Sequence, residues 1–149
     1  MSRVTEHQRE MLRQFGFLLE LPEDERRNFL GATVFRRVPA GDPVLEEDGR
    51  LENILLVLSG NIRVFKSNED GREIGLYHIG AGEMGAVAVV CLLGRQEARS
   101  PVSAAAAQDT LLACVPADTF RYEYAVSPQL QRFVCRLLAD KLCRVIDLV

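Results

Sequence analysis

The stretch GAGEMGAVAVVCLLGRQEARSP, residues 80–101, combines features from which a ligand site could be built. It joins a glycine-rich turn to an uninterrupted apolar run and ends on Arg99, Ser100 and Pro101. A helix that begins after glycines presents unpaired backbone N–H groups and a partial positive charge to an anion, and an arginine would neutralise that anion. The segment GRQEARS is equally typical of a charged surface loop. Residues 80–101 are therefore a candidate site for a phosphate-bearing ligand, with a surface loop as the alternative.

Cysteine and histidine side chains are the other groups in this sequence that could do chemistry. They are Cys91, Cys114, Cys135, Cys143, His7 and His78. The cysteines form no CxxC pair, so we read them as small buried thiols rather than as disulfides. Cys91 as a redox-sensing thiol is the alternative, although such thiols lie beside a cation and the nearest one in sequence is Arg95. His78 shares a strand face with Ile74 and Leu76, and we expect that face to point into the β-structure.

The sequence lacks the motifs of the common enzyme classes. It contains no nucleophile elbow, no HxH or HExxH arrangement, no Walker loop and no dinucleotide fingerprint. A metal-dependent β-roll would need clustered histidines, whereas His7 and His78 lie on distant segments. We therefore expect a binding protein without catalytic residues and without a metal.

Size and charge predict one domain that contacts neither DNA nor membranes through these residues. The chain has 149 residues, 48% of them apolar, a net charge of −3 and 18 basic residues scattered along its length. The first residues, MSRVTEHQREMLRQ, lack the apolar core of a signal peptide. No apolar run approaches the roughly 20 residues of a membrane span. We predict one cytoplasmic domain over residues 1–149.

The elements that must position the candidate site are helices at both ends and short strands between them. Residues 1–31 are predicted to form a helical preface, with one helix over 6–17 and another between Pro22 and Gly31. Over residues 32–116 the apolar period changes to two, which predicts brief strands separated by turns such as Gly60-Asn61. The apolar run at 86–93 is predicted to be a short inserted helix. The expected fold class is mainly β with flanking helices, arranged as an antiparallel barrel or roll.

A long apolar helix is predicted within the last segment, residues 117–149. Ser127 is a suitable N-cap and Pro128 suits the first turn. The apolar residues cover an arc of roughly 220° on the helix, about twice the width that one core requires. We predict that the additional surface binds a second copy of the helix through Leu130, Val134, Leu137, Leu138, Val145 and Val149.

Two further points concern this helix. A helix lying in a deep groove of its own domain is the alternative to a dimer contact. The chain stops within the apolar pattern, at RVIDLV, and has neither a glycine cap nor a proline there. We therefore expect a further domain to follow.

The order of these features resembles the cyclic-nucleotide-binding domain, and in particular the effector domain of the CRP/FNR family of bacterial transcription regulators. The resemblance rests on Gly41-Asp42, LLVLSGNIRVF, NEDGREIGLYHIGAGE and the final apolar helix. It implies a double-stranded β-helix, or jelly roll, followed by a dimerisation helix. In that family a helix-turn-helix comes next, so DNA would be bound only through a domain missing from this chain.

The resemblance also implies where an effector would bind. In members that bind cyclic AMP, a Gly-Glu pair opens the short helix, and an Arg-Ser or Arg-Thr pair followed by Ala closes the segment. Here the first pair falls on Ala86-Val87 or on Gly85-Ala86, so neither register supplies a carboxylate for the ribose. Arg99-Ser100 resemble the closing pair, with Pro101 in place of Ala. The implied effector residues are Gly85, Ala86, Val87, Arg99 and Ser100.

The missing carboxylate disfavours a cyclic nucleotide as the effector. Losing one charge-assisted hydrogen bond costs about 1.5–3 kcal/mol, which is roughly ten- to a hundredfold in affinity. The apolar residues of the inserted helix at 86–93 favour an apolar or neutral effector instead.

Three functional hypotheses follow. The first is a homodimeric effector-sensing domain of a CRP/FNR-type transcription regulator that binds a small molecule. The second is a stand-alone cyclic-nucleotide-binding module that regulates another protein. The third is a haem-based or thiol-based redox or gas sensor that uses His78 and Cys91. An iron–sulfur cluster of the FNR type would need cysteines near the N-terminus, and none precedes Cys91.

Overall fold

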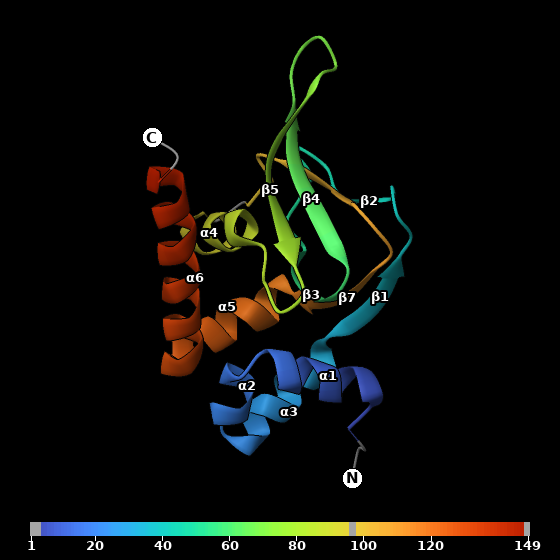
Figure 1. Ribbon diagram of the computed structural model, residues 1–149. Helices are drawn as coiled ribbons and strands as arrows, with labels where there is room; N and C mark the ends of the chain where they lie inside the picture. The colour runs from blue at the N-terminus through green and yellow to red at the C-terminus, as the bar shows by residue number, and fades with distance from the viewer. Residues whose placement is uncertain (1–3, 96–97, 148–149) are drawn as a thin grey trace.

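A computed structural model of the chain describes residues 4–95 and 98–147. Helices flank the strands at both ends of the chain: α1 (Glu6–Gln14), α2 (Phe17–Glu20), α3 (Glu23–Ala32), α5 (Ala117–Val126) and α6 (Pro128–Asp147). The strands are β1 (Val34–Val38), β2 (Pro43–Leu45), β3 (Asn53–Ser59), β4 (Asn61–Ser67), β5 (Glu73–Gly80), β6 (Ser103–Ala106) and β7 (Thr110–Pro116). The inserted helix α4 (Ala86–Gly94) follows β5 in sequence. Figure 1 shows the strands gathered in a roll, with α1, α2 and α3 at one end and α6 along one side.

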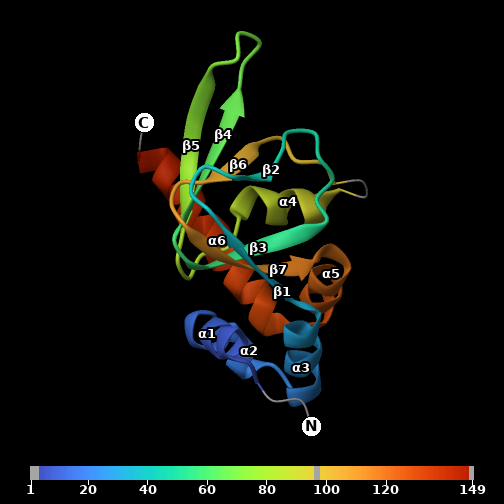
Figure 2. The same cartoon turned by 90° about the vertical axis from the view of Figure 1, so that its right-hand side faces the viewer.

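The strands form two antiparallel sheets, with the orders β1-β7-β3 and β2-β6-β4-β5. Their inner faces share one apolar cluster, to which Val57, Ile62 and Leu112 belong. Strand β7 also contributes Leu111 and Ala113 to a second cluster, shared with the helices. Burial on both faces explains why β7 is a continuous apolar run. The jelly-roll fold, mainly β with flanking helices, is confirmed (Figure 2).

The helical preface differs from the prediction in one respect. The single helix expected over residues 6–17 is interrupted, because α1 ends at Gln14 and α2 begins at Phe17. Phe15 and Phe17 are both buried in the helix-facing cluster. Residues two apart point about 200° apart in a continuous helix, so the break at Phe15, where φ is −115° and ψ is 82°, lets both rings enter one core.

The turn between β3 and β4 depends on the missing side chain of Gly60. This residue has a φ of +94°, in the left-handed region that favours glycine. A Cβ atom there would lie 2.5 Å from the Asp109 carbonyl oxygen and 2.5 Å from Thr110 Oγ1. A turn is therefore present at Gly60-Asn61, but the hairpin predicted there is wrong, because β3 pairs with β7 in one sheet and β4 pairs with β5 and β6 in the other.

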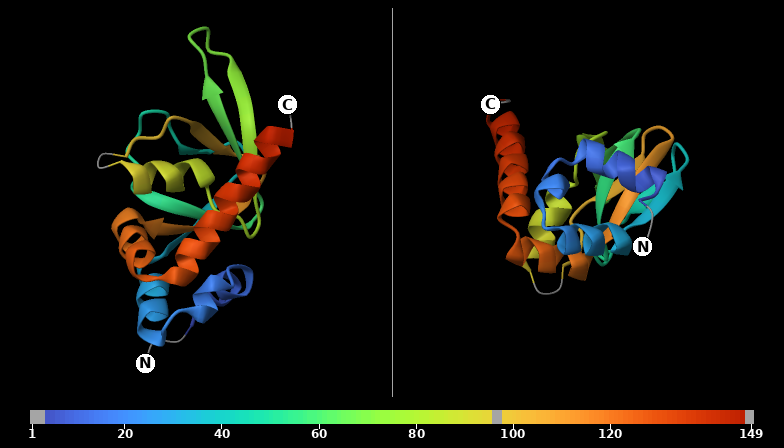
Figure 3. Two further views of the ribbon diagram at one scale, coloured as in Figure 1. Left: turned by 90° about the vertical axis from the view of Figure 1, so that its left-hand side faces the viewer. Right: turned by 90° about the horizontal axis from the view of Figure 1, so that it is seen from below.

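Helices α4, α5 and α6 pack on one another beside the roll. Ser127 begins α6, since its Oγ accepts a hydrogen bond of 3.1 Å from the backbone N–H of Leu130. Seen from below, the C-terminal part of α6 stands clear of the rest of the chain (Figure 3). None of the helices within 4–95 and 98–147 has the length and hydropathy that a membrane span needs.

Candidate functional site

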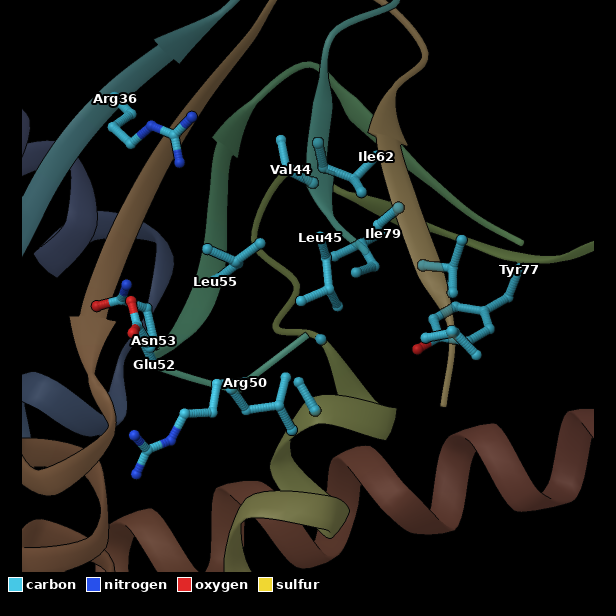
Figure 4. Close-up of a pocket in the computed structure, with 16 residues that line it drawn as sticks. Arg36, Val44, Leu45, Arg50, Glu52, Asn53, Leu55, Ile62, Tyr77 and Ile79 are labelled. Atoms are coloured by element: carbon cyan, nitrogen blue, oxygen red, sulfur yellow. The ribbon is translucent and has the colours of Figure 1, made fainter. Parts of the chain in front are cut away.

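A cavity of about 220 Å³ lies inside the roll, beside the N-terminus of α4 (Figure 4). Its apolar wall is contributed by both sheets and includes Val44, Leu45, Leu55, Ile62, Ile79 and Val102. Its polar lining residues are Arg36, Arg50, Glu52 and Asn53, and Tyr77 and Gly85 also face it. Figure 4 shows Arg36, Glu52 and Asn53 on one side of the cavity and Tyr77 on the other. The cavity is therefore amphipathic, with a charged side and an apolar body.

Strand geometry places Arg36 at the cavity. Arg36 lies opposite Leu112 in the β1–β7 register, and Leu112 belongs to the cluster inside the roll. Because cross-strand partners point to the same face, the Arg36 side chain leaves β1 on the inner face, where it lines the cavity and remains exposed to solvent. There it comes close to Cys114: burial raises the pKa of the Cys114 thiol, and the Arg36 guanidinium partly opposes that shift.

The second arginine and the acidic residue come from the connection between β2 and β3. Arg50 pairs with Arg99 in an isolated antiparallel bridge, and Glu52 and Asn53 follow it in the chain. The lining carries two guanidinium groups and one carboxylate, which gives it a net charge of +1. No salt bridge in the described part of the chain involves Arg36, Arg50 or Glu52. Arg36, Arg50 and Glu52 are all exposed, so the charged part of the lining is open to solvent.

The N-terminus of α4 lies at the opposite side and already has a hydrogen-bond partner. The backbone N–H of Val87 donates to the Tyr77 hydroxyl at 3.3 Å. Burial is the main cause that raises the pKa of Tyr77 above its ordinary value, so the hydroxyl is neutral at physiological pH. A neutral hydroxyl therefore occupies the position where a helix N-terminus would otherwise bind an anion.

The five effector residues implied by the sequence are not gathered at the cavity. Gly85 lines it, whereas Ala86 is buried and Val87 packs against the cluster inside the roll. Arg99 is exposed, and its Nη1 donates to the Asp48 carbonyl oxygen at 2.8 Å.

Ser100 has a structural role. Ser100 is buried, and its Oγ accepts a hydrogen bond of 3.2 Å from the Val102 backbone N–H. This contact is local and turns the chain into β6. Neither Arg99 nor Ser100 lines the cavity, so the charge there comes from Arg36 and Arg50 instead.

His78 points away from the roll, contrary to the expectation from the sequence. A β-bulge at Leu76 separates His78 from Ile74, so the three residues do not share one face, and the side chains of Ile74 and Leu76 are about half exposed. Tyr77 and Ile79, on either side of it, face the cavity, so alternation turns His78 outward. The His78 Nδ1 atom makes a hydrogen bond with Asn61 Oδ1.

The four cysteines occupy three kinds of surroundings. Cys91 is half-buried against the helix-facing cluster and Cys114 is buried, whereas Cys135 and Cys143 are exposed on α6. The prediction of buried thiols is therefore wrong for Cys135 and Cys143. Within residues 4–95 and 98–147, no three His, Cys, Asp or Glu side chains come together as a metal site.

Sequence reasoning missed Arg36, Arg50 and Tyr77. The pair Arg36-Arg37 within the strand VFRRV contained a usable signal. Alternation places consecutive strand residues on opposite faces, so one of two adjacent arginines must point into the roll. For Arg50 and Tyr77 there was no comparable local signal, because the cavity depends on the pairing of distant strands.

Helix α6 is divided into a core-facing part and an exposed part. Leu130 and Val134 are buried in the core of their own chain, and Leu137 and Leu138 are half-buried against it. Because Leu130 and Val134 are buried in their own chain, they cannot contact a second copy of the helix, as the sequence had predicted they would. Val149 lies outside the described residues.

Further along α6 the apolar residues are exposed. The side chains are 60–61% exposed at Leu142, Val145 and Ile146. Together these three residues form an apolar surface that no other element of the described chain buries. A large exposed apolar surface on a helix marks an interaction site.

Lys141 joins α6 to the cavity wall. Its Nζ lies 5.3 Å from the centroid of the Tyr77 ring, within the range of a cation–π interaction. The same Nζ lies 3.6 Å from Glu83 Oε2, just before α4. Glu83 in turn accepts a hydrogen bond of 2.8 Å from the Gly80 backbone N–H at the end of β5. One α6 side chain therefore contacts both the cavity wall and the segment that leads into α4.

Comparison with known proteins supports this description. Residues 35–125, more than half of the chain, match the family model of the cyclic nucleotide-binding domain. No curated protein sequence matches the chain.

Several solved structures have a similar fold. A regulator assigned to the CRP/FNR family from Eubacterium rectale has a TM-score of 0.78 and 22% identity, with 90% of this chain and 61% of that chain covered. The sensor domain of the transcriptional regulator DNR from Pseudomonas aeruginosa has a TM-score of 0.74 and 15% identity, covering 96% and 93%. The Thermus thermophilus catabolite activator protein has a TM-score of 0.67 and 28% identity, covering 89% and 60%.

The chain spans about three fifths of the Eubacterium rectale and Thermus thermophilus proteins, at 61% and 60% of their lengths. It covers 93% of the DNR sensor domain. The jelly roll with its inserted helix, the cavity and the family match together show that this chain belongs to the cyclic nucleotide-binding domain family, with the fold of the sensor domains of CRP/FNR transcription regulators.

Proposed function

We propose that the chain is the effector-sensing and dimerisation domain of a CRP/FNR-type transcription regulator. A small molecule in the roll cavity would change the packing of α6, and α6 would pass this change to a DNA-binding helix-turn-helix outside these 149 residues. The observation that carries the proposal is that α6 contacts the cavity wall through Lys141 and also presents an exposed apolar surface. Cyclic nucleotide binding is weak in this proposal, because Ala86 and Val87 supply no carboxylate to the cavity side of α4.

The dimer contact is proposed on the exposed side of α6. The spacing of four and three residues runs through Gln131, Cys135, Leu138, Leu142, Val145 and Val149. Such a heptad spacing forms the seam of a two-stranded coiled coil. Leu142 and Val145 lie on this seam and are 61% and 60% exposed in the single chain. A second copy of the chain is the partner that would bury them.

Signal transfer is proposed through Tyr77. Its hydroxyl accepts from Val87 in α4, and its ring lies beside Lys141 in α6. A ligand that shifts Tyr77 would therefore change the contacts of both helices at once. The size of the response is limited by the difference in ligand affinity between the two arrangements.

Sedimentation velocity of purified protein tests the dimer. We expect the unmodified chain to sediment at about 33 kDa, twice the 16.6 kDa of one chain. We expect Leu142→Glu and Val145→Glu to sediment as monomers, since each would bury a carboxylate in the seam. The matched control is Arg136→Glu, an exposed position on the opposite side of α6, which should remain a dimer. A monomeric unmodified chain, or dimers of both seam variants, would refute the assignment of α6.

A further inference from the structure

We infer that the cavity binds a small organic anion with an apolar body, whose acidic group faces Arg36 and Arg50. This inference rests on the proposed function, because it names the class of effector for the same cavity. The inferred ligand differs from the apolar or neutral effector expected from residues 86–93. Its acidic group lies away from the N-terminus of α4, the part of the cavity where a helix would ordinarily bind an anion.

The charged residues that line the cavity favour an acidic ligand. Arg36 comes from β1 and Arg50 from the connection before β3, and both line the cavity. Figure 4 shows them on either side of Glu52 and Asn53, with the Arg50 guanidinium pointing away from the aliphatic wall, and both arginines are exposed. Glu52 provides the only carboxylate of the lining in the described residues, which leaves one positive charge in excess. A guanidinium matches a carboxylate in two parallel hydrogen bonds. The chemistry that complements this side of the cavity is therefore an organic acid.

The donors at the opposite side of the cavity, near the start of α4, already have partners within the protein. The Val87 N–H, which an anion at the start of α4 would need, donates to the Tyr77 hydroxyl at 3.3 Å. Lys141 lies on the other side of Tyr77, with its Nζ 3.6 Å from Glu83 Oε2. The Lys141 ammonium group therefore already forms an ion pair with a carboxylate of the protein. An acidic group is thus better accommodated at Arg36 and Arg50 than at α4.

The remaining space of the cavity is small and lined mainly by apolar residues. Between the two sides the wall consists of aliphatic residues such as Leu45, Leu55 and Ile62, with small residues at Ala88 and Ala104. The volume of about 220 Å³ is below the roughly 300–1,000 Å³ usual for ligand pockets. The ligand is therefore compact, with a short aliphatic or aromatic body in place of a sugar and a base.

Isothermal titration calorimetry with octanoate and 1-octanol tests the inference, because the two probes share one aliphatic chain and differ in the acidic group. We expect the unmodified chain to bind octanoate at least about tenfold more tightly than 1-octanol, as one charge-assisted contact requires. Cyclic AMP is the third probe, and we expect it to bind more weakly than octanoate. Equal affinities for octanoate and 1-octanol, no binding of octanoate, or tighter binding of cyclic AMP would each overturn the inference.

Variants then locate the acidic group. We expect Arg36→Gln combined with Arg50→Gln to weaken octanoate binding about tenfold or more and to leave 1-octanol binding unchanged. Glu52→Gln should strengthen octanoate binding, because it removes the one negative charge of the lining. Arg37→Gln is the matched control: Arg37 is next to Arg36 on β1 and does not line the cavity, so both affinities should stay the same. Unchanged octanoate binding in the double variant would contradict the assignment.

The two proposals fail separately. A chain that dimerises but shows none of the expected preference for octanoate would lose only the effector class. A chain that binds octanoate through Arg36 and Arg50 but remains a monomer would lose the proposed function and keep the site. Thermal unfolding of each variant verifies that the fold is intact before the titrations are compared.

Discussion

Glu123 in α5 is a buried acidic residue whose ionisation should make the stability of the fold depend on pH. It is only 3% exposed, and its Oε2 has no hydrogen-bond partner within the described residues. Burial, followed by the neighbouring Glu25 and Asp24 of α3, raises the pKa of Glu123 from 4.5 to about 6. The protonated form is therefore favoured in the folded chain.

The sign of the effect follows from proton binding. Between pH 4.5 and about 6 the folded chain holds the Glu123 proton more tightly than the unfolded chain does. The corresponding stability is fully present below pH 4.5 and is lost as the pH rises through about 6. The difference of 1.5 between 6 and 4.5 corresponds to about 2 kcal/mol at 1.36 kcal/mol per pH unit. Asp24 is exposed, so solvent screening reduces the expected loss to about 1–2 kcal/mol.

Urea unfolding of Glu123→Gln and of the unmodified chain, at pH 4.5 and pH 7.5, measures this loss. We expect the variant to be more stable than the unmodified chain by about 1–2 kcal/mol at pH 7.5, and by much less at pH 4.5, where Glu123 is protonated. Glu69→Gln is the control, since Glu69 lies in the exposed turn between β4 and β5 and should give the same difference at both pH values. If Glu123→Gln showed no larger gain at pH 7.5 than at pH 4.5, the proposed cost of the buried carboxylate would be refuted.

Two further predictions concern stability and use the same unfolding assay at one pH. Gly60→Ala should destabilise the chain by about 2–4 kcal/mol, because the residue combines a φ of +94° with a Cβ position 2.5 Å from the Asp109 carbonyl oxygen. Gly31→Ala, within α3 and with no atom inside 4 Å of the added Cβ, is its control and should be neutral or stabilising; equal losses in the two variants would contradict this explanation. Ser127→Ala should cost about 1 kcal/mol, because the Leu130 N–H loses its 3.1 Å cap, while Ser127→Asn should keep most of the stability. An alanine variant as stable as the unmodified chain would show that the cap contributes nothing.

The sequence was sufficient to predict the roll because strand and turn signals are local. Alternation in NILLVL and IRVF identified β3 and β4, and Gly60 identified the turn between them. The helix break near Gly16 was not predicted, since the apolar pattern continues through Phe17 and only tertiary packing of the two phenylalanine rings requires the interruption.

The candidate site was harder to predict, because alternation reveals two faces without showing which one borders a cavity. His78 illustrates the difficulty: simple alternation groups it with Ile74 and Leu76, but a β-bulge at Leu76 interrupts that alternation, and His78 is exposed. In the same way Leu130 and Val134 belong to the apolar arc of α6 together with Val145, yet only Val145 is exposed. A helix that packs on its own core and on a partner carries one continuous apolar pattern. Only the position of the roll decides which of these apolar residues are buried.

The contacts around Tyr77 connect these observations into one thermodynamic scheme. Lys141 lies on α6, one residue before Leu142 of the proposed seam, and contacts both the Tyr77 ring and Glu83. A rotation of α6 that improves the seam therefore changes the position of the cation relative to the cavity wall. Conversely, when the acidic group of a ligand binds Arg36, the apolar body of that ligand would pack against Tyr77. This packing would in turn change the contact between the Tyr77 ring and Lys141. Because such coupling is reciprocal, an effector that strengthens the dimer must bind the dimer more tightly by the same factor.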